Sequence, residues 1–136
     1  MADKIELEIV TPEGQVFSGK VDGVTIPGSV GYLGILPGHA PLVTELKIGV
    51  ISCQADNSES RLFCAWGFAE ILGDKVSILA DQVEKPEDID VEAARADKIR
   101  AQSILDAKAD DTDFQEAVNL LDAANARLEV AGKTIK

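Results

Sequence analysis

Residues 75–94 read KVSILADQVEKPEDIDVEAA, and the spacing of apolar residues changes within this stretch. Upstream of it, apolar side chains alternate or form short runs between Gly and Pro, which is typical of strands. Lys85-Pro86-Glu87-Asp88 breaks that pattern, and Asp90 is a suitable N-cap for a following helix. The sequence therefore predicts an all-β part, residues 1–85, and a helical part, residues 86–136.

The first part reads as at least eight short strands. Residues 5–10, Ile-Glu-Leu-Glu-Ile-Val, alternate between apolar and polar with a period of two. Thr11-Pro12-Glu13-Gly14 follows as a turn. Further along, Gly67 separates two more strands, residues 61–66 and 68–71. Many short strands at close spacing favour an antiparallel sandwich or barrel.

The second part reads as two helices joined by a polar turn at residues 108–111. Helical spacing places one apolar stripe on each helix: Ala93, Ala96, Ile99, Ser103 and Ala107 on the first, and Phe114, Ala117, Leu121, Ala124, Leu128 and Ala131 on the second. Thr112 and Gln115 form a capping box, and Gly132 ends the second helix. An Ala-rich hairpin buries little area, so we expect it to lean weakly on the sandwich or on a partner.

Composition excludes several classes of function. The chain has 136 residues, of which 46% are hydrophobic and only 4% aromatic, so we expect one core of aliphatic side chains. A formal net charge of −11 argues against nucleic acid or anionic lipid as a partner. No apolar run is long enough to cross a bilayer, and residues 1–4 do not resemble a signal peptide. We therefore expect no direct membrane insertion.

The two cysteines, Cys53 and Cys64, both lie in strand-like apolar segments. Two buried thiols are the simpler interpretation, because a disulfide would require an oxidising compartment that nothing in the sequence suggests.

The most distinctive segment is residues 27–46, PGSVGYLGILPGHAPLVTEL. Its glycines permit sharp turns and its prolines stiffen the chain between them. We expect a rigid, protruding and mostly apolar surface, which suits docking to another molecule rather than turnover of a substrate.

Within that segment, residues 34–42, GILPGHAPL, resemble the signature of the epsilon subunits of F-type ATP synthases. Residues 17–19, FSG, and residues 66–71, WGFAEI, are also similar to that family. So are residues 76–81, VSILAD, and the helical residues 110–114 and 126–128. The resemblance extends over essentially the whole chain.

The resemblance implies a sandwich of about ten strands followed by an antiparallel two-helix hairpin. It implies that residues 1–85 bind the gamma subunit and the ring of c subunits. Residues 86–136 would be a regulatory arm that extends towards the alpha/beta catalytic head and inhibits ATP hydrolysis. Such a subunit is a non-catalytic part of the rotor. It would be peripheral to the cytoplasmic face of a bacterial plasma membrane, in preference to the stromal face of a thylakoid.

The resemblance also implies which residues touch the partners. Tyr32, Leu33 and Gly34 match the family segment that contacts the loops of the c-ring, and His39 is expected near the same interface. Relatives can carry an acidic residue where this chain has Tyr32, so we expect a more apolar contact here.

Some bacterial relatives bind ATP at the folded hairpin, and Glu84, Asp90 and Arg100 match positions that contact the nucleotide there. Ala93 and Ala123, however, stand where those relatives carry Arg, and a triphosphate needs such bidentate cations. We therefore expect weak or no ATP binding and no obligatory cofactor. Asp90 then acts as a helix cap and Arg100 as a solvated charge.

Catalytic and metal sites are not predicted. His39 is the single histidine, and its neighbours supply neither a nucleophile nor further metal ligands. Asp110, Asp111 and Asp113 lack the spacing of a calcium loop. Two alternatives to a rotor subunit are a small hydrolase and a free-standing ligand-binding sandwich whose helices form a lid.

Overall fold

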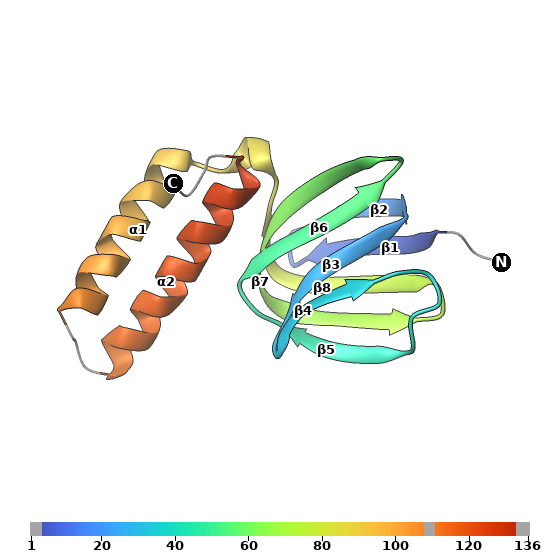
Figure 1. Ribbon diagram of the computed structural model, residues 1–136, viewed down its shortest axis with the longest axis horizontal. Helices are drawn as coiled ribbons and strands as arrows, with labels where there is room; N and C mark the ends of the chain where they lie inside the picture. The colour runs from blue at the N-terminus through green and yellow to red at the C-terminus, as the bar shows by residue number, and fades with distance from the viewer. Residues whose placement is uncertain (1–3, 108–110, 133–136) are drawn as a thin grey trace.

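The computed structural model describes residues 4–107 and 111–132. Eight strands come first: β1 (Ile5–Thr11), β2 (Gly14–Val21), β3 (Gly23–Gly28), β4 (Gly31–Ile35), β5 (Leu42–Leu46), β6 (Gly49–Ala55), β7 (Ser58–Leu72) and β8 (Lys75–Glu84). A 3-10 turn, η1 (Pro86–Asp88), leads to α1 (Val91–Asp106) and α2 (Asp111–Val130). The two helices lie side by side at one end of the strands, and the N-terminus lies at the other end (Figure 1).

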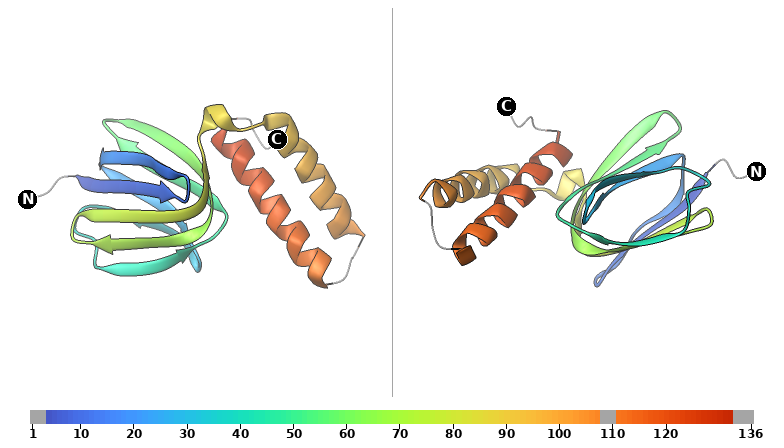
Figure 2. Two further views of the ribbon diagram at one scale, coloured as in Figure 1. Left: turned by 180° about the vertical axis from the view of Figure 1, so that it is seen from behind. Right: turned by 60° about the horizontal axis from the view of Figure 1, so that its bottom comes forward.

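The strands curl into a sandwich in the order β2-β1-β8-β7-β5-β3-β4, and β6 pairs with both β3 and β7. Each of these pairings is antiparallel except β1 with β8. The two faces of the sandwich are visible in Figure 2. The predicted fold class is confirmed, with eight described strands close to the expected ten.

Part of the difference in strand number lies at Gly67, which the sequence analysis placed between two strands. The structure instead has one long strand, β7, that bends there. Its first half pairs with β6, from Ser58 to Cys64, and its second half pairs with β5, from Gly67 to Ile71. Trp66 and Gly67 both have positive φ, 57° and 139°, which turns the strand between the two layers.

The main core is aliphatic, as the composition predicts. In β1 the alternating residues Ile5, Leu7 and Ile9 are all buried. Cys53 and Cys64 are buried free thiols, in agreement with the simpler interpretation. Burial raises their pKa values to about 11 and about 12, so both stay protonated and unreactive at neutral pH.

The predicted stripe of α1 is wrong. Ile99, which the spacing placed inside, is 69% exposed, whereas Ala94 and Ala101 are buried. Both faces of α1 are rich in Ala, so hydrophobicity alone does not distinguish them. The close approach of the helices selects the face whose buried residues are both Ala.

The prediction for α2 is confirmed at Ala117, Ala124 and Leu128, which are buried, whereas Leu121 and Ala131 are partly buried and Phe114 is half exposed. Gly132 follows the helix with φ of 76°, as a C-terminal glycine should. The predicted turn at residues 108–110 and the side chain of Thr112 lie outside the described residues.

We predict that Gly67→Ala destabilises the sandwich by about 2 kcal/mol or more, because a methyl group there would meet both a positive φ and the Leu79 carbonyl oxygen. Gly14→Ala is the matched control, since Gly14 has a similar φ of 130° but no atom within 4 Å of the added carbon. Urea denaturation measures both variants. Equal losses would show that the crowding at Gly67 does not matter.

Candidate functional site

The three residues expected around a nucleotide have separate structural roles. Glu84 ends β8, Asp90 caps α1, and Arg100 lies further along that helix. At 1.5 Å per residue, Arg100 is about 15 Å along the helix axis from Asp90. The structure therefore does not gather the three side chains around one point.

Asp90 behaves as the N-cap that the sequence predicts. Its Oδ1 accepts a hydrogen bond of 3.0 Å from the backbone N–H of Ala93. This contact satisfies one of the free N–H groups in the first turn of the helix. The Asp90 carboxylate thus stabilises α1 directly.

Arg100 is paired within its own helix. Its Nη2 donates to Asp97 Oδ1 at 3.2 Å, three residues earlier. The Arg100 side chain is 65% exposed, so the contact is a solvated ion pair of small energetic value.

Glu84 instead faces the second helix. Its carboxylate accepts two hydrogen bonds from Arg127 of α2, Nε to Oε1 at 2.9 Å and Nη2 to Oε2 at 3.0 Å. The same guanidinium lies over the Phe63 ring, 4.3 Å from its centroid. Arg127, the basic residue in the last turn of α2, is a functional residue that the sequence pattern did not predict.

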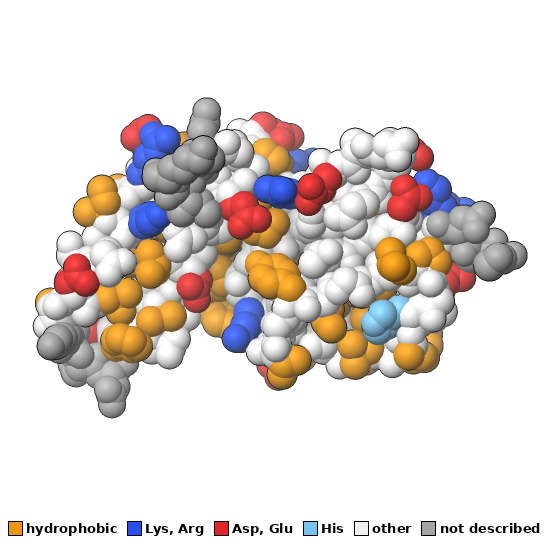
Figure 3. Space-filling model, viewed as in Figure 1, with side chains coloured by type: hydrophobic (Ala, Val, Ile, Leu, Met, Phe, Trp, Pro, Cys, Tyr) orange, Lys and Arg blue, Asp and Glu red, His pale blue; other side chains and the backbone are white. Residues whose placement is uncertain are grey.

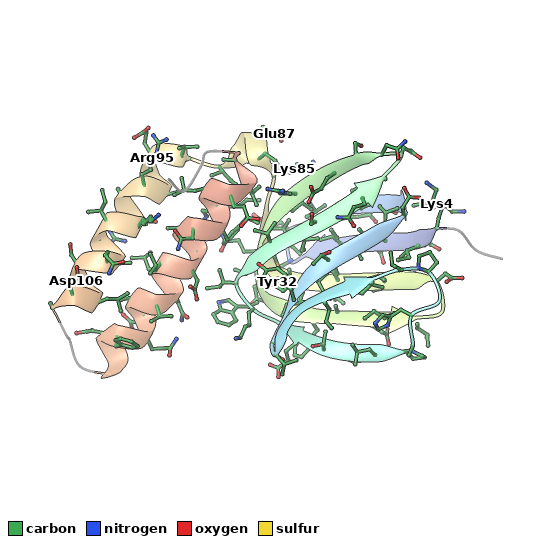
Figure 4. All side chains as sticks on the ribbon, viewed as in Figure 1. Lys4, Tyr32, Lys85, Glu87, Arg95 and Asp106 are labelled. Carbon is green, nitrogen blue, oxygen red and sulfur yellow. The ribbon has the colours of Figure 1, made fainter. Side chains whose placement is uncertain are left out.

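Tyr32, Leu33 and Gly34 all belong to β4, so their side chains alternate between its faces. Leu33 packs against the main core, whereas Tyr32 is exposed on the outside. The Tyr32 hydroxyl accepts a hydrogen bond from the backbone N–H of Val50 at 3.1 Å. Tyr32 therefore lies on the hairpin side of the sandwich (Figure 4).

His39 is half-buried in the loop that follows β4. Its Nδ1 lies 2.7 Å from the Ala40 carbonyl oxygen. The preceding N–H, of Gly38, donates to Asp74 in the turn between β7 and β8. This is the end of the sandwich far from the helices, where hydrophobic side chains gather around the histidine (Figure 3). Tyr32 thus lies beside Val50, which pairs with Phe63 inside β7, whereas the His39 loop lies beyond the C-terminal end of that strand. The two residues are apart and do not form one site.

A hollow of about 520 Å³ opens beside the bend in β7. Apolar side chains line it, including Trp66, Phe68 and Leu79, which are 43%, 54% and 57% exposed. Phe68 and Leu79 are direct neighbours across β7 and β8. Glu45 and Asp81 also line the hollow. It therefore combines exposed apolar surface with negative charge.

This hollow was not predicted, although the strand sequences contain a signal for it. Leu79 sits between Ile78 and Ala80, which are both buried, so Leu79 must point outwards in a strand. Phe68 next to buried Ala69 gives the same signal. Large apolar residues at outward positions of a strand mark a surface for contact.

Among the described residues, no three His, Cys, Asp or Glu side chains are arranged to hold a metal ion. Neither helix, within its described residues, is long and apolar enough to cross a membrane.

Comparison with known proteins gives one consistent result. Residues 4–86 match the family described as ATP synthase, Delta/Epsilon chain, beta-sandwich domain. Residues 87–132 match the long alpha-helix domain of the same chain.

Curated relatives agree with the family matches. The ATP synthase epsilon chain of Alkalihalophilus pseudofirmus is 45% identical and covers 95% of this chain and 98% of its own length. That of Geotalea daltonii is 40% identical over 98% of both chains. That of Koribacter versatilis is 54% identical over 77% of this chain and 74% of its own.

Solved structures share the fold. A chain in the Euglena gracilis mitochondrial ATP synthase superposes with a TM-score of 0.82 at 21% identity, over 96% of this chain and 82% of that one. A chain in the central stalk and c-ring of Tetrahymena thermophila mitochondrial ATP synthase gives 0.63 at 14% identity, over 94% and 96%. With both family domains matched in order and relatives of 40–45% identity along its length, this chain belongs to the ATP synthase delta/epsilon family, among the epsilon chains.

Proposed function

We propose that this chain is a rotor subunit in the central stalk of an F-type ATP synthase. Residues 1–85 would bind the gamma subunit and the c-ring, and residues 86–136 would form a regulatory arm that reaches the alpha/beta head. The observation that carries the proposal is exposed apolar surface on a rigid sandwich, beside a hairpin docked by a short seam. Such a sandwich is suited to binding neighbouring subunits, and a hairpin held by a short seam is suited to changing its position.

The hollow beside the bend of β7 is the proposed surface for gamma. Its exposed aromatic residues, Trp66 and Phe68, are of the types that dominate binding energy at protein interfaces. Glu45 and Asp81 beside them favour a partner segment that combines an apolar side chain with Lys or Arg. The positive φ of Trp66 holds this surface in place, because the bend is built into the sheet.

The Gly- and Pro-rich segment is the proposed surface for the c-ring. Leu36 is exposed near His39 at the end of the sandwich far from the helices, whereas Tyr32 is exposed on the hairpin side, so the two ends of the segment would contact a partner separately. Gly34 leaves the strand between them open to close approach. Leu33 supports the segment from inside, since it packs on the core. His39 would contribute through the shape of its loop, which one hydrogen bond, from the Gly38 N–H to Asp74, ties to the turn between β7 and β8.

We propose that the chain has no catalytic activity of its own. Among the described residues, the His39 ring is hydrogen-bonded to the Ala40 carbonyl oxygen and to no hydroxyl or thiol that it could activate. The proposed location is peripheral, at the cytoplasmic face of a bacterial membrane. That location is supported by the bacterial relatives.

We predict that Phe68→Glu lowers affinity for the gamma subunit by at least about thirty-fold, the equivalent of about 2 kcal/mol for an interface hot spot. Leu72→Glu is the matched control, because Leu72 is exposed on the same strand but does not line the hollow. Calorimetric titration with gamma measures both. Equal affinities for the two variants would place the gamma contact elsewhere, and no binding by the unaltered chain would favour the free-standing sandwich.

We predict that removal of residues 86–136 leaves a folded sandwich that still binds gamma. The main core contains no helical residue, so it does not depend on the hairpin. In a reconstituted complex this truncation should raise the rate of ATP hydrolysis, because it removes the arm that is proposed to inhibit it. Circular dichroism and hydrolysis assays measure the two effects. Unchanged hydrolysis would contradict the regulatory role.

We predict no saturable ATP binding below about 1 mM, or about −4 kcal/mol. Glu84 is already paired with Arg127, and Asp90 caps its helix, so neither is free to arrange a nucleotide. A titration with Mg-ATP followed by NMR is the measurement, with ADP as the comparison ligand. Clear saturation at lower concentration would overturn this prediction.

A further inference from the structure

The helical hairpin contacts the sandwich along one short seam on β6 and β7. The buried apolar residues of this seam are Val50, Phe63 and Ala65 from the sheet, Ile89 from the linker, and Ala126 and Val130 from α2. Phe63 is the largest of these side chains, and the buried apolar residues that α2 contributes are only Ala and Val. The hairpin therefore buries little apolar area against the sandwich, and the polar contacts at the edges of the seam contribute more of the docking energy.

Arg127 makes the most specific of those contacts. Its two hydrogen bonds to Glu84, at 2.9 and 3.0 Å, use the planar fork that suits a carboxylate. Its guanidinium also covers the Phe63 ring at 4.3 Å. The Arg127 and Glu84 side chains are 20% and 22% exposed, so water screens this pair less than a surface pair.

The sheet holds the two partners of Arg127 in register. Phe63 and Glu84 are directly opposite each other across β7 and β8, and on a pleated sheet opposite residues point to the same face. Gln82 further positions the carboxylate, because its amide donates to Glu84 Oε2 at 2.7 Å. One guanidinium of α2 therefore fits a ring and a carboxylate that the strands have already arranged.

The other ion pairs of the hairpin hold it to the sandwich more weakly or not at all. Arg61 of β7 approaches Glu129 of α2 only to 3.9 Å, and both side chains are more than 40% exposed. Arg95 pairs with Glu92 inside α1. The strongest geometry between hairpin and sandwich, among the described residues, is that of Arg127 with Glu84 and Phe63.

We propose that Glu84, Phe63 and Arg127 form a latch that keeps the hairpin docked without any bound ligand, and that undocking requires this latch to open. Loss of one charged partner leaves the other partly buried and unpaired, which penalises the docked state strongly. Loss of both removes that penalty, so the two effects are not additive. The proposal gives a mechanism to the arm and rests on its proposed movement, but docking itself is measured on the isolated chain.

The test is single-molecule energy transfer in the full chain, with dyes on Glu13→Cys in the sandwich and Gln102→Cys in α1, both exposed positions. Cys53 and Cys64 are buried in the main core, which keeps their thiols out of reach of the dye. The measured quantity is the ratio of docked to undocked molecules. We expect Glu84→Gln and Arg127→Gln each to lower this ratio by about ten-fold or more, as hydrogen bonds to charged groups suggest.

In the double variant, Glu84→Gln with Arg127→Gln, the ratio of docked to undocked molecules should fall by less than the product of the two single fold-changes. Arg95→Gln is the matched control and should leave the ratio unchanged, because its partner lies within α1. Single variants within about two-fold of the unaltered chain would overturn the latch, given the strength of charged hydrogen bonds. So would an equal loss in Arg95→Gln. In the assembled complex, a lower docked ratio with unchanged ATP hydrolysis would support the latch and reject the regulatory role of the arm.

Discussion

The helical hairpin cannot bury its apolar stripe alone, and much of the architecture follows from this constraint. The helices meet through Ala94, Ala101, Ala117 and Ala124, which allow close approach but remove little apolar area from water. Stability must therefore come from the sandwich, through Phe63 and its neighbours. The sandwich has no such need, since its aliphatic core closes without helical residues. The dependence runs in one direction, which allows the hairpin to leave without unfolding the rest.

Strand β7 joins the separate tasks of the molecule. Phe63 in its first half faces α2, Trp66 and Gly67 bend it, and Phe68 in its second half lines the outer hollow. The dock of the hairpin and the proposed gamma surface are therefore a few residues apart on one rigid element. A partner bound at the hollow would therefore lie close to the docked hairpin. Figures 1 and 4 show the helices beside the end of the sandwich at which β8 leads into the linker.

Sequence reasoning recovered most of the fold. Alternation located Ile5, Leu7 and Ile9 in the core, and Asp90 marked the start of α1, because these signals are local. It failed where tertiary contacts decide. The buried face of α1 was misassigned, since two Ala-rich faces are equivalent until a partner helix selects one. The bend at Gly67 was interpreted as a strand boundary, because a positive φ inside a paired strand has the same sequence signal as a turn.

The candidate site shows the same division. The resemblance selected Asp90, Arg100, Tyr32 and His39 as site residues. In the structure Asp90 caps α1 and Arg100 pairs within the same helix, while Tyr32 and His39 lie apart. The contacts of Arg127 and the hollow at Phe68 depend on strand register and on the position of α2 against the sheet, which no spacing in the sequence reveals.

The central claim is that the hairpin depends on the sandwich but the sandwich does not depend on the hairpin. Its most direct test is native-state hydrogen exchange of the isolated chain. We predict that amides of α1 and α2 exchange by an opening that is lower in free energy than the opening of the core strands β1, β7 and β8. A single shared opening free energy for helices and strands would contradict the account.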